Sequence, residues 1–113
     1  MKINELVALI DGTVLVKGRE DAEITCGYTC DLLSWVMAHG APGMAWVTVQ
    51  THLNVIAVAV LSEMACVILP ESIEMEQESL DKAQSEGMTV ITSPFPAYEI
   101  CGRLYTQGIP SES

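Results

Sequence analysis

Four side chains that can form hydrogen bonds stand together where one apolar stretch of the chain gives way to the next. They are Gln50, Thr51, His52 and Asn54. Residues 46–50 before them are predicted to form a strand, residues 53–64 an apolar helix, and residues 66–69 a second strand. Such a connection is typical of a right-handed parallel crossover. The polar corner then lies where free amide groups and the helix dipole favour an anion.

This corner has two interpretations. In the first, Thr51, His52 and the first amides of the helix hold a phosphate, a carboxylate or the edge of a nucleotide. In the second, Thr51 only caps the helix, and His52 or Asn54 ties down a neighbouring loop. A capped helix and an anion site use the same geometry, so the sequence leaves both open.

Two other turns add candidates to the same site. Tyr28, Asp31 and Ser34 surround a strand-to-helix turn, where Asp31 is predicted to be the N-cap of a helix over residues 32–39. A carboxylate aimed into a shared cleft would oppose an anion. Ser93 follows the last predicted strand, either as a ligand contact or as a plain turn residue. The predicted ligand-binding residues are therefore Gln50, Thr51, His52, Asn54, Tyr28, Asp31, Ser34 and Ser93.

Other chemistry is disfavoured. The four cysteines are Cys26, Cys30, Cys66 and Cys101. The C-x3-C spacing of the first two is loose for zinc even with His39 or His52, so we expect no metal and no other cofactor. No elbow motif surrounds a cysteine, which argues against a nucleophilic thiol. Neither G-x-x-x-x-G-K-[ST] nor G-x-G-x-x-G occurs, so a kinase is not expected.

Composition narrows the class of protein. The chain has 113 residues, which fits one domain. Of these residues 50% are hydrophobic but only 5% aromatic, so the core should be aliphatic and contain sulfur. A net charge of −10 disfavours nucleic-acid binding. The longest apolar run, residues 55–61, is far shorter than a membrane span. With no visible secretory signal, we expect a cytoplasmic protein with reduced thiols and no membrane partner.

The order of predicted elements favours an α/β fold with three layers. Helices are expected at residues 2–10, 32–39, 53–64, 78–86 and 97–107, and strands at 13–16, 23–28, 46–50, 66–69 and 89–92. The β-branched residues at 55–60 would also suit a strand, but length and the preceding polar turn favour a helix. We expect a mainly parallel sheet of four to five strands with helices on both faces, and a frayed tail at residues 110–113.

Two stretches resemble a known family. They are G-Y-x-x-D-L-L-S-x-V-M at residues 27–37 and W-V-T-V-Q-T-H-x-N-V-I-A-V-A at residues 46–59, and I-C-G-R-L-Y at residues 100–105 looks like the closing helix. With these motifs the whole chain, residues 1–113, resembles a single DRTGG domain. Such domains occur alone and as regulatory, dimerising parts of phosphotransacetylases and pyrophosphatases. They are also similar to the N-terminal, non-catalytic domain of HPr kinase/phosphorylase.

The chain departs from this family after the strand at residues 66–69. Where the name-giving Gly-Gly often follows a Thr, it has Pro70-Glu71-Ser72, so the backbone freedom of glycine is missing there.

The resemblance implies a regulatory, non-enzymatic role. We expect a small-molecule-sensing domain, a homodimer, that binds a nucleotide or phosphorylated metabolite at its strand-to-helix turns. The apolar content of so small a chain also leaves surface for a partner. The alternatives are a scaffold or protein-interaction module without a ligand and, further off, an enzyme acting on a phosphorylated metabolite.

Overall fold

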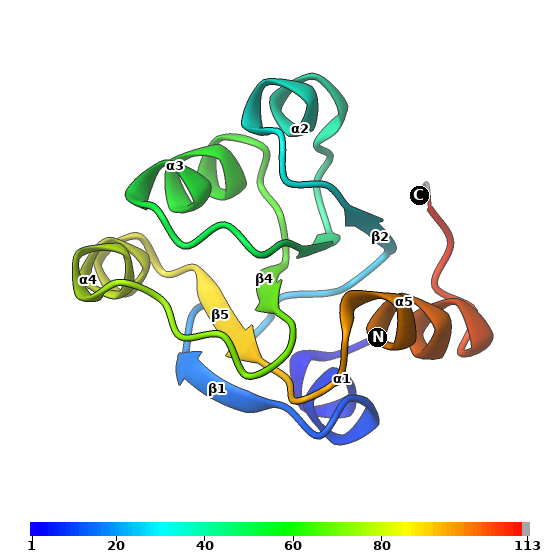
Figure 1. Cartoon of the computed structure of the whole chain (residues 1–113). Helices are drawn as coiled ribbons and strands as arrows, with labels where there is room; N and C mark the ends of the chain where they lie inside the picture. Colours follow the sequence, from blue (N-terminus) through cyan, green and yellow to red (C-terminus); the bar gives the residue numbers. More distant parts are fainter. Residues whose placement is uncertain (112–113) are drawn as a thin grey trace.

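A five-stranded sheet crosses the computed structural model, which describes residues 1–111 (Figure 1). Its strands lie in the order β1-β5-β4-β3-β2. They are β1 (Thr13–Val16), β2 (Cys26–Thr29), β3 (Met44–Val47), β4 (Cys66–Leu69) and β5 (Thr89–Thr92). The helices are α1 (Ile3–Leu9), α2 (Leu33–His39), α3 (Leu53–Leu61), α4 (Gln77–Glu86) and α5 (Ala97–Thr106).

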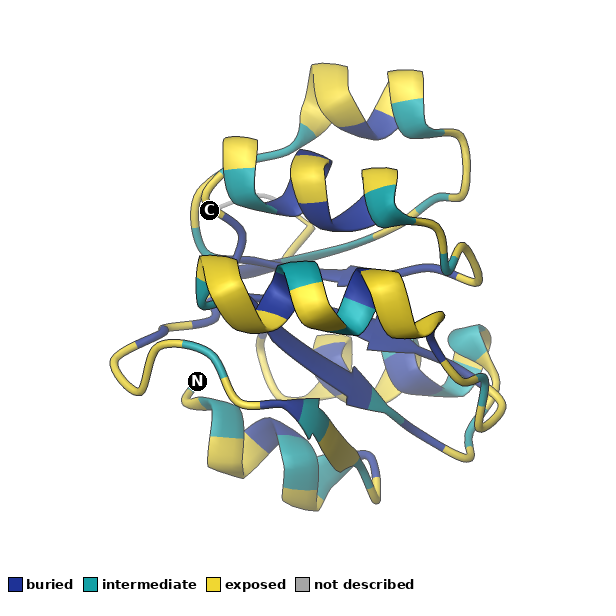
Figure 2. Ribbon diagram, turned by 90° about the vertical axis from the view of Figure 1, so that its left-hand side faces the viewer, coloured by how far each residue is buried: buried dark blue, intermediate teal, exposed yellow. Residues whose placement is uncertain are grey.

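The topology explains the layers. β2, β3, β4 and β5 are parallel neighbours, and each pair is joined by a helix. Because successive right-handed crossovers step the same way along the sheet, α2, α3 and α4 cover one face. They lie side by side in Figure 2, while α1 and α5 cover the other face (Figures 1 and 2). β1 runs antiparallel to β5 at the sheet edge. The expected three-layer, mainly parallel α/β fold is confirmed.

The central crossover is also confirmed, with α3 a helix rather than a strand. Two strands differ from their predicted bounds. β3 ends at Val47. The N–H of Val49, two residues further on, donates to the Asp31 side chain in the β2–α2 loop and not to a neighbouring strand. β2 begins only at Cys26, since Glu23 bridges to Lys2 next to α1.

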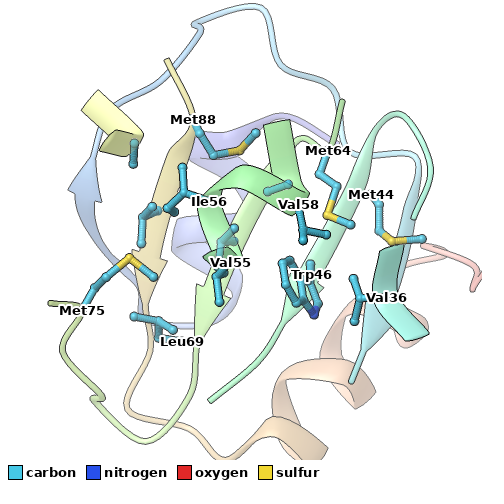
Figure 3. Close-up of a cluster of buried hydrophobic side chains, with 14 of the residues drawn as sticks. Val36, Met44, Trp46, Val55, Ile56, Val58, Met64, Leu69, Met75 and Met88 are labelled. Atoms are coloured by element: carbon cyan, nitrogen blue, oxygen red, sulfur yellow. The ribbon is translucent and has the colours of Figure 1, made fainter. Parts of the chain in front are cut away.

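Each face of the sheet buries its own cluster. The cluster under α2, α3 and α4 contains the Trp46 side chain and the methionines at positions 44, 64, 75 and 88 (Figure 3). The Trp46 indole N–H donates to the Cys30 carbonyl at 2.9 Å, so its one polar atom is satisfied. Aliphatic residues fill the other face, among them Leu6, Ile91 and Ile100. The expected aliphatic, sulfur-containing core is therefore confirmed.

The segment after β4 keeps a backbone shape that usually needs glycine. Glu71 and Ser72 have φ of 56° and 57°, in the left-handed region where L side chains are strained. These two residues stand where the family resemblance leads one to expect Gly-Gly. The glycines are absent, but the conformation that glycine permits is present.

Part of the carboxyl-terminal tail is held in place. The Gly27 N–H on the outer edge of β2 donates to the Pro110 carbonyl at 2.8 Å, and Ile109 is buried beside it. The expected fraying is therefore wrong at Pro110, and residues 112–113 lie outside the described part of the chain. Among the described helices, each is too short or too polar to cross a membrane.

Candidate functional site

Asp31 joins two strand-to-helix loops at the carboxyl edge of the sheet. Its Oδ1 accepts a hydrogen bond from Thr48 Oγ1 at 2.8 Å and another from the Val49 N–H at 2.9 Å. The expected N-cap role is wrong, because the N-cap of α2 is Leu32, whose side chain makes no capping hydrogen bond. In the parallel register Thr29 lies opposite Val47, so the loop after β3 begins beside the loop that holds Asp31. Thr48 and Val49 can therefore donate to the Asp31 carboxylate.

Gln50 completes the link between the same loops. Its Nε2 donates to the Asp31 carbonyl at 3.0 Å, and its backbone N–H donates to Thr48 Oγ1 at 3.2 Å. Together with the bonds to the Asp31 carboxylate, these contacts hold the β2–α2 and β3–α3 loops in one arrangement. Interlinked hydrogen bonds of this kind make a surface rigid before any ligand arrives.

His52 is the N-cap of α3, a role that the second interpretation of the sequence gave to Thr51. Its Nδ1 accepts from the Asn54 N–H at 3.0 Å, and its carbonyl accepts from the Val55 N–H at 2.9 Å. Two of the first amides of α3 are therefore occupied, and fewer are open to an anion than the sequence suggested. Because Nδ1 accepts, the proton of the neutral ring is on Nε2, which makes Nε2 a donor on an exposed side chain.

Thr51 packs against the neighbouring helix. Its Oγ1 donates to Glu76 Oε2 at 3.2 Å, and its carbonyl accepts from the buried Ser79 hydroxyl at 2.8 Å. These bonds fix the start of α3 against the start of α4. Asn54, in the first turn of α3, is exposed. The corner thus presents Gln50, His52 and Asn54 on its surface while Thr51 faces α4.

Tyr28 and Ser34 lie outside this network. The Tyr28 ring stacks on His39 with centroids 6.2 Å apart, and His39 stacks on Trp35 at 4.6 Å, so three rings lie together beside α2. Ser34 is exposed in the first turn of α2. Tyr28 also lines a cavity of about 280 Å³ that Cys101 lines from the opposite layer. Burial raises the pKa of the Cys101 thiol.

Ser93 is a structural residue. It is fully buried, its Oγ donates to the Ile10 carbonyl at 2.7 Å, and it accepts from the Phe95 N–H at 3.2 Å. Beside it, α4 and α5 leave on opposite faces, which is where open α/β sheets usually form a ligand crevice. Here backbone bonds from Glu71 to Phe95 and from Ser72 to Ser93, 2.9 and 2.8 Å long, close that position.

The thiols and histidines do not converge. Among residues 1–111, no group of three or more His, Cys, Asp or Glu side chains could hold a metal ion. Cys66 is fully buried, which raises the pKa of its thiol to about 12. With no metal or thiol site among these residues, the best candidate site at the carboxyl edge of the sheet is the polar surface of Gln50, His52 and Asn54.

Comparisons with known proteins bear on the fold. A solved structure from Clostridium perfringens, containing the CBS and DRTGG domains of the regulatory region of a pyrophosphatase, is similar to this chain with a TM-score of 0.71 and 12% sequence identity. The similarity covers 98% of this chain and 48% of the other, so this chain spans about half the length of its neighbour. No protein-family model and no curated protein matches the sequence. At this identity the likeness shows a shared fold.

Proposed function

We propose that this chain is a non-catalytic regulatory domain that binds a nucleotide or phosphorylated metabolite at the carboxyl edge of β2 and β3. The observation that carries the proposal is the surface formed by Gln50, His52 and Asn54 on the β3–α3 loop and the first turn of α3, a loop that Asp31 ties to the neighbouring β2–α2 loop. Such a surface offers several hydrogen-bond donors in a fixed arrangement, as recognition of a nucleotide requires.

The state of Asp31 supports this role. The Asp31 carboxylate is engaged within the loops, because its Oδ1 accepts bonds from Thr48 and Val49, and these two donors offset part of its repulsion of a phosphate. The Nε2–H of His52 then provides a donor at the positive end of α3. The neighbour of similar fold is complexed with diadenosine tetraphosphate, its activator, which supports a nucleotide as the class of ligand.

The reactive groups support a non-catalytic role. The Asp31 carboxylate and the Ser93 hydroxyl, which could act in catalysis, are bonded to other parts of the fold. A structural role in holding the loops explains why both residues are present, so neither needs a catalytic role.

A panel of adenine nucleotides, including diadenosine tetraphosphate, tests the site by thermal shift. A ligand at a hundred times its Kd stabilises the folded state by about 2.7 kcal/mol. The informative variant is His52→Asn, because Asn also caps a helix well but lacks the Nε2 donor. We expect it to fold normally and lose the shift, while His39→Asn, the matched control at the other histidine, retains it. No shift with any nucleotide, or an unchanged shift in His52→Asn, would contradict the proposal.

We further propose that two copies associate through the outer surface of α2 and α3. Residues 32–62 contain no Asp, Glu, Lys or Arg, although the chain as a whole has a net charge of −10. We call the exposed side chains of α2 and α3 the uncharged face; they include Trp35, Met37, Ala57 and Leu61. Two copies of so acidic a chain repel each other least where both are uncharged, and apolar contact then favours association. A two-fold pair would bury this face on both copies.

Sedimentation equilibrium tests the dimer with a matched pair of variants. Leu61→Glu places one negative charge on the uncharged face, and Gln84→Glu places one on the exposed face of α4. We expect Leu61→Glu to weaken association by about a hundredfold, because a buried unpaired charge costs several kcal/mol. Gln84→Glu should associate like the parent. A parent protein that is monomeric at high micromolar concentration would refute the dimer and leave the nucleotide proposal standing.

A further inference from the structure

A cavity of about 550 Å³ lies between α1, β1 and the loop that follows β1. Its volume is in the range of small-molecule sites in proteins. Thr89, one of its lining residues, begins β5, so the cavity is at the amino edge of the parallel strands. Gln50 and His52 lie at the carboxyl edge. The cavity is therefore a separate site from the one discussed above.

The floor of the cavity is apolar. Ile3 and Val7, one helical turn apart on α1, and Val14 on β1 all line it. A bulge in β1 makes this possible: Val14 pairs with Ile91, whereas Val16 pairs with Val90 after a shift in register. Residues two apart in a regular strand share a face, but the bulge lets Val16 join the core under α4 while Val14 faces α1.

One wall is fixed in advance. The Gly18 N–H donates to Thr89 Oγ1 at 3.1 Å, and the Arg19 N–H donates to the Gly87 carbonyl at 3.2 Å. A Cβ on Gly18 would lie 2.4 Å from the Gly87 carbonyl oxygen, so only glycine allows this approach. The loop is thus held against β5 without any ligand, which reduces the entropy that binding would cost.

The rim of the cavity is basic. The chain has five Lys and Arg residues against fifteen Asp and Glu, yet Lys2, Lys17 and Arg19 all line this cavity, with Glu20 as the one acidic lining residue. Each of these three cations is paired with an exposed carboxylate: Lys2 with Glu23 at 3.2 Å, Lys17 with Glu20 at 3.2 Å and Arg19 with Asp21 at 3.7 Å. Exposed ion pairs contribute little free energy, so an incoming anion can replace the carboxylates at small cost.

We propose that this cavity binds an amphipathic anion, in which an apolar chain or ring lies on Ile3, Val7 and Val14 and a carboxylate or phosphate meets Lys2, Lys17 and Arg19. Burying the apolar part supplies most of the affinity, and the basic rim selects the anion over a neutral molecule of the same shape. This site does not depend on the proposed nucleotide site.

Octanoate is the probe, with acetate and 1-octanol as matched compounds that lack the chain or the charge. We expect octanoate to shift the amide NMR signals of Val7, Val14 and Gly18, octanol to bind more weakly, and acetate not to bind. Lys17→Glu and Val14→Asp change exposed residues and should each weaken octanoate by about tenfold. Lys82→Glu, the same reversal on α4, should leave the affinity within about twofold of the parent, because exposed distant charges are screened.

Three results would overturn this inference. One is the absence of signal changes in this cavity up to millimolar octanoate. Another is unchanged affinity in both Lys17→Glu and Val14→Asp, after thermal melts have shown that both variants fold. The third is octanol binding as tightly as octanoate, which would exclude the role of the basic rim. His52→Asn should bind octanoate like the parent, so failure at one site is distinguishable from failure at the other.

Discussion

Helices α3 and α4 cover the same face of the sheet, but the outer surface of α3 is uncharged and that of α4 is charged. α3 follows β3 and α4 follows β4 in consecutive crossovers, and the two helices pack side by side. The exposed stripe of α3 is Asn54, Ala57 and Leu61, without a charge. α4 carries Glu78, Asp81, Lys82 and Glu86. The sheet determines what each helix buries, so the outer surfaces are free to differ according to whether they meet water or a partner.

The inner surfaces differ too. Four residues of α3 are buried, Val55, Ile56, Val58 and Ala59, whereas the buried residues of α4 are Ser79 and Ala83. A helix that is apolar almost all round is typical of a buried position. We therefore expect α3 to contribute more than α4 to the free energy of unfolding. We also expect α3 to be the helix that is stabilised when a second copy covers its outer surface.

The largest expected effect compares one truncation on each helix. Ile56→Ala removes a fully buried side chain and should lower the free energy of unfolding by about 2–5 kcal/mol. Leu80→Ala on α4, where the side chain is only partly buried, should cost about 1–2 kcal/mol. Urea denaturation measures both. Equal losses would contradict the prediction that α3 contributes more to the free energy of unfolding than α4.

Substitution of Asp31, the charged residue just before residues 32–62, should change the free energy of unfolding by a smaller amount. Asp31→Ala leaves the Thr48 hydroxyl and the Val49 N–H without their acceptor and should cost about 1–3 kcal/mol. Asp31→Asn keeps a carbonyl oxygen and should cost less. Asp21→Ala is the control, because its ion pair with Arg19 is exposed. A loss no greater than that of the control would mean that the loops are held by packing alone.

The segment that leads into α4 should respond in the opposite direction. Glu71→Gly and Ser72→Gly relieve left-handed backbone conformations, so each should raise the free energy of unfolding by about 0.5–1 kcal/mol. Gly87 has φ of 71° at the C-cap of α4 and already benefits from glycine. Gly87→Ala should therefore destabilise by a similar amount. Thermal melts of the three variants decide the matter, and destabilisation by both new glycines would show that no strain is stored there.

Local sequence patterns predict some features of this fold and miss others. The bounds of β1, β4 and β5, and the helical state of α3, depend on local apolar periodicity and on turn residues. Residues 32–62 could be recognised as uncharged by inspection. The partner of Asp31 was wrongly predicted because a local cap competes with donors seventeen and eighteen residues away, which only the parallel register brings near.

The candidate sites show the same division. The polar corner after β3 was found because all of its residues lie within positions 50–54. The choice of His52 over Thr51 as cap depends instead on α4, which engages the Thr51 hydroxyl and carbonyl. The cavity beside α1 was missed because its lining comes from three separate segments. They meet only through the antiparallel pairing of β1 with β5. The cluster of Lys17 and Arg19 was the one local signal.

The smallest expected effect concerns the charges that distinguish α4. Lys82 Nζ lies 3.9 Å from Glu86 Oε1, one helical turn away, and both side chains are substantially exposed. Lys82→Gln should therefore lower the free energy of unfolding by less than about 0.5 kcal/mol, and less still in high salt. Urea denaturation at two ionic strengths provides the measurement. A loss above about 1 kcal/mol, well beyond what exposed pairs contribute, would mean that the charges of α4 hold the helix in place and do more than face water.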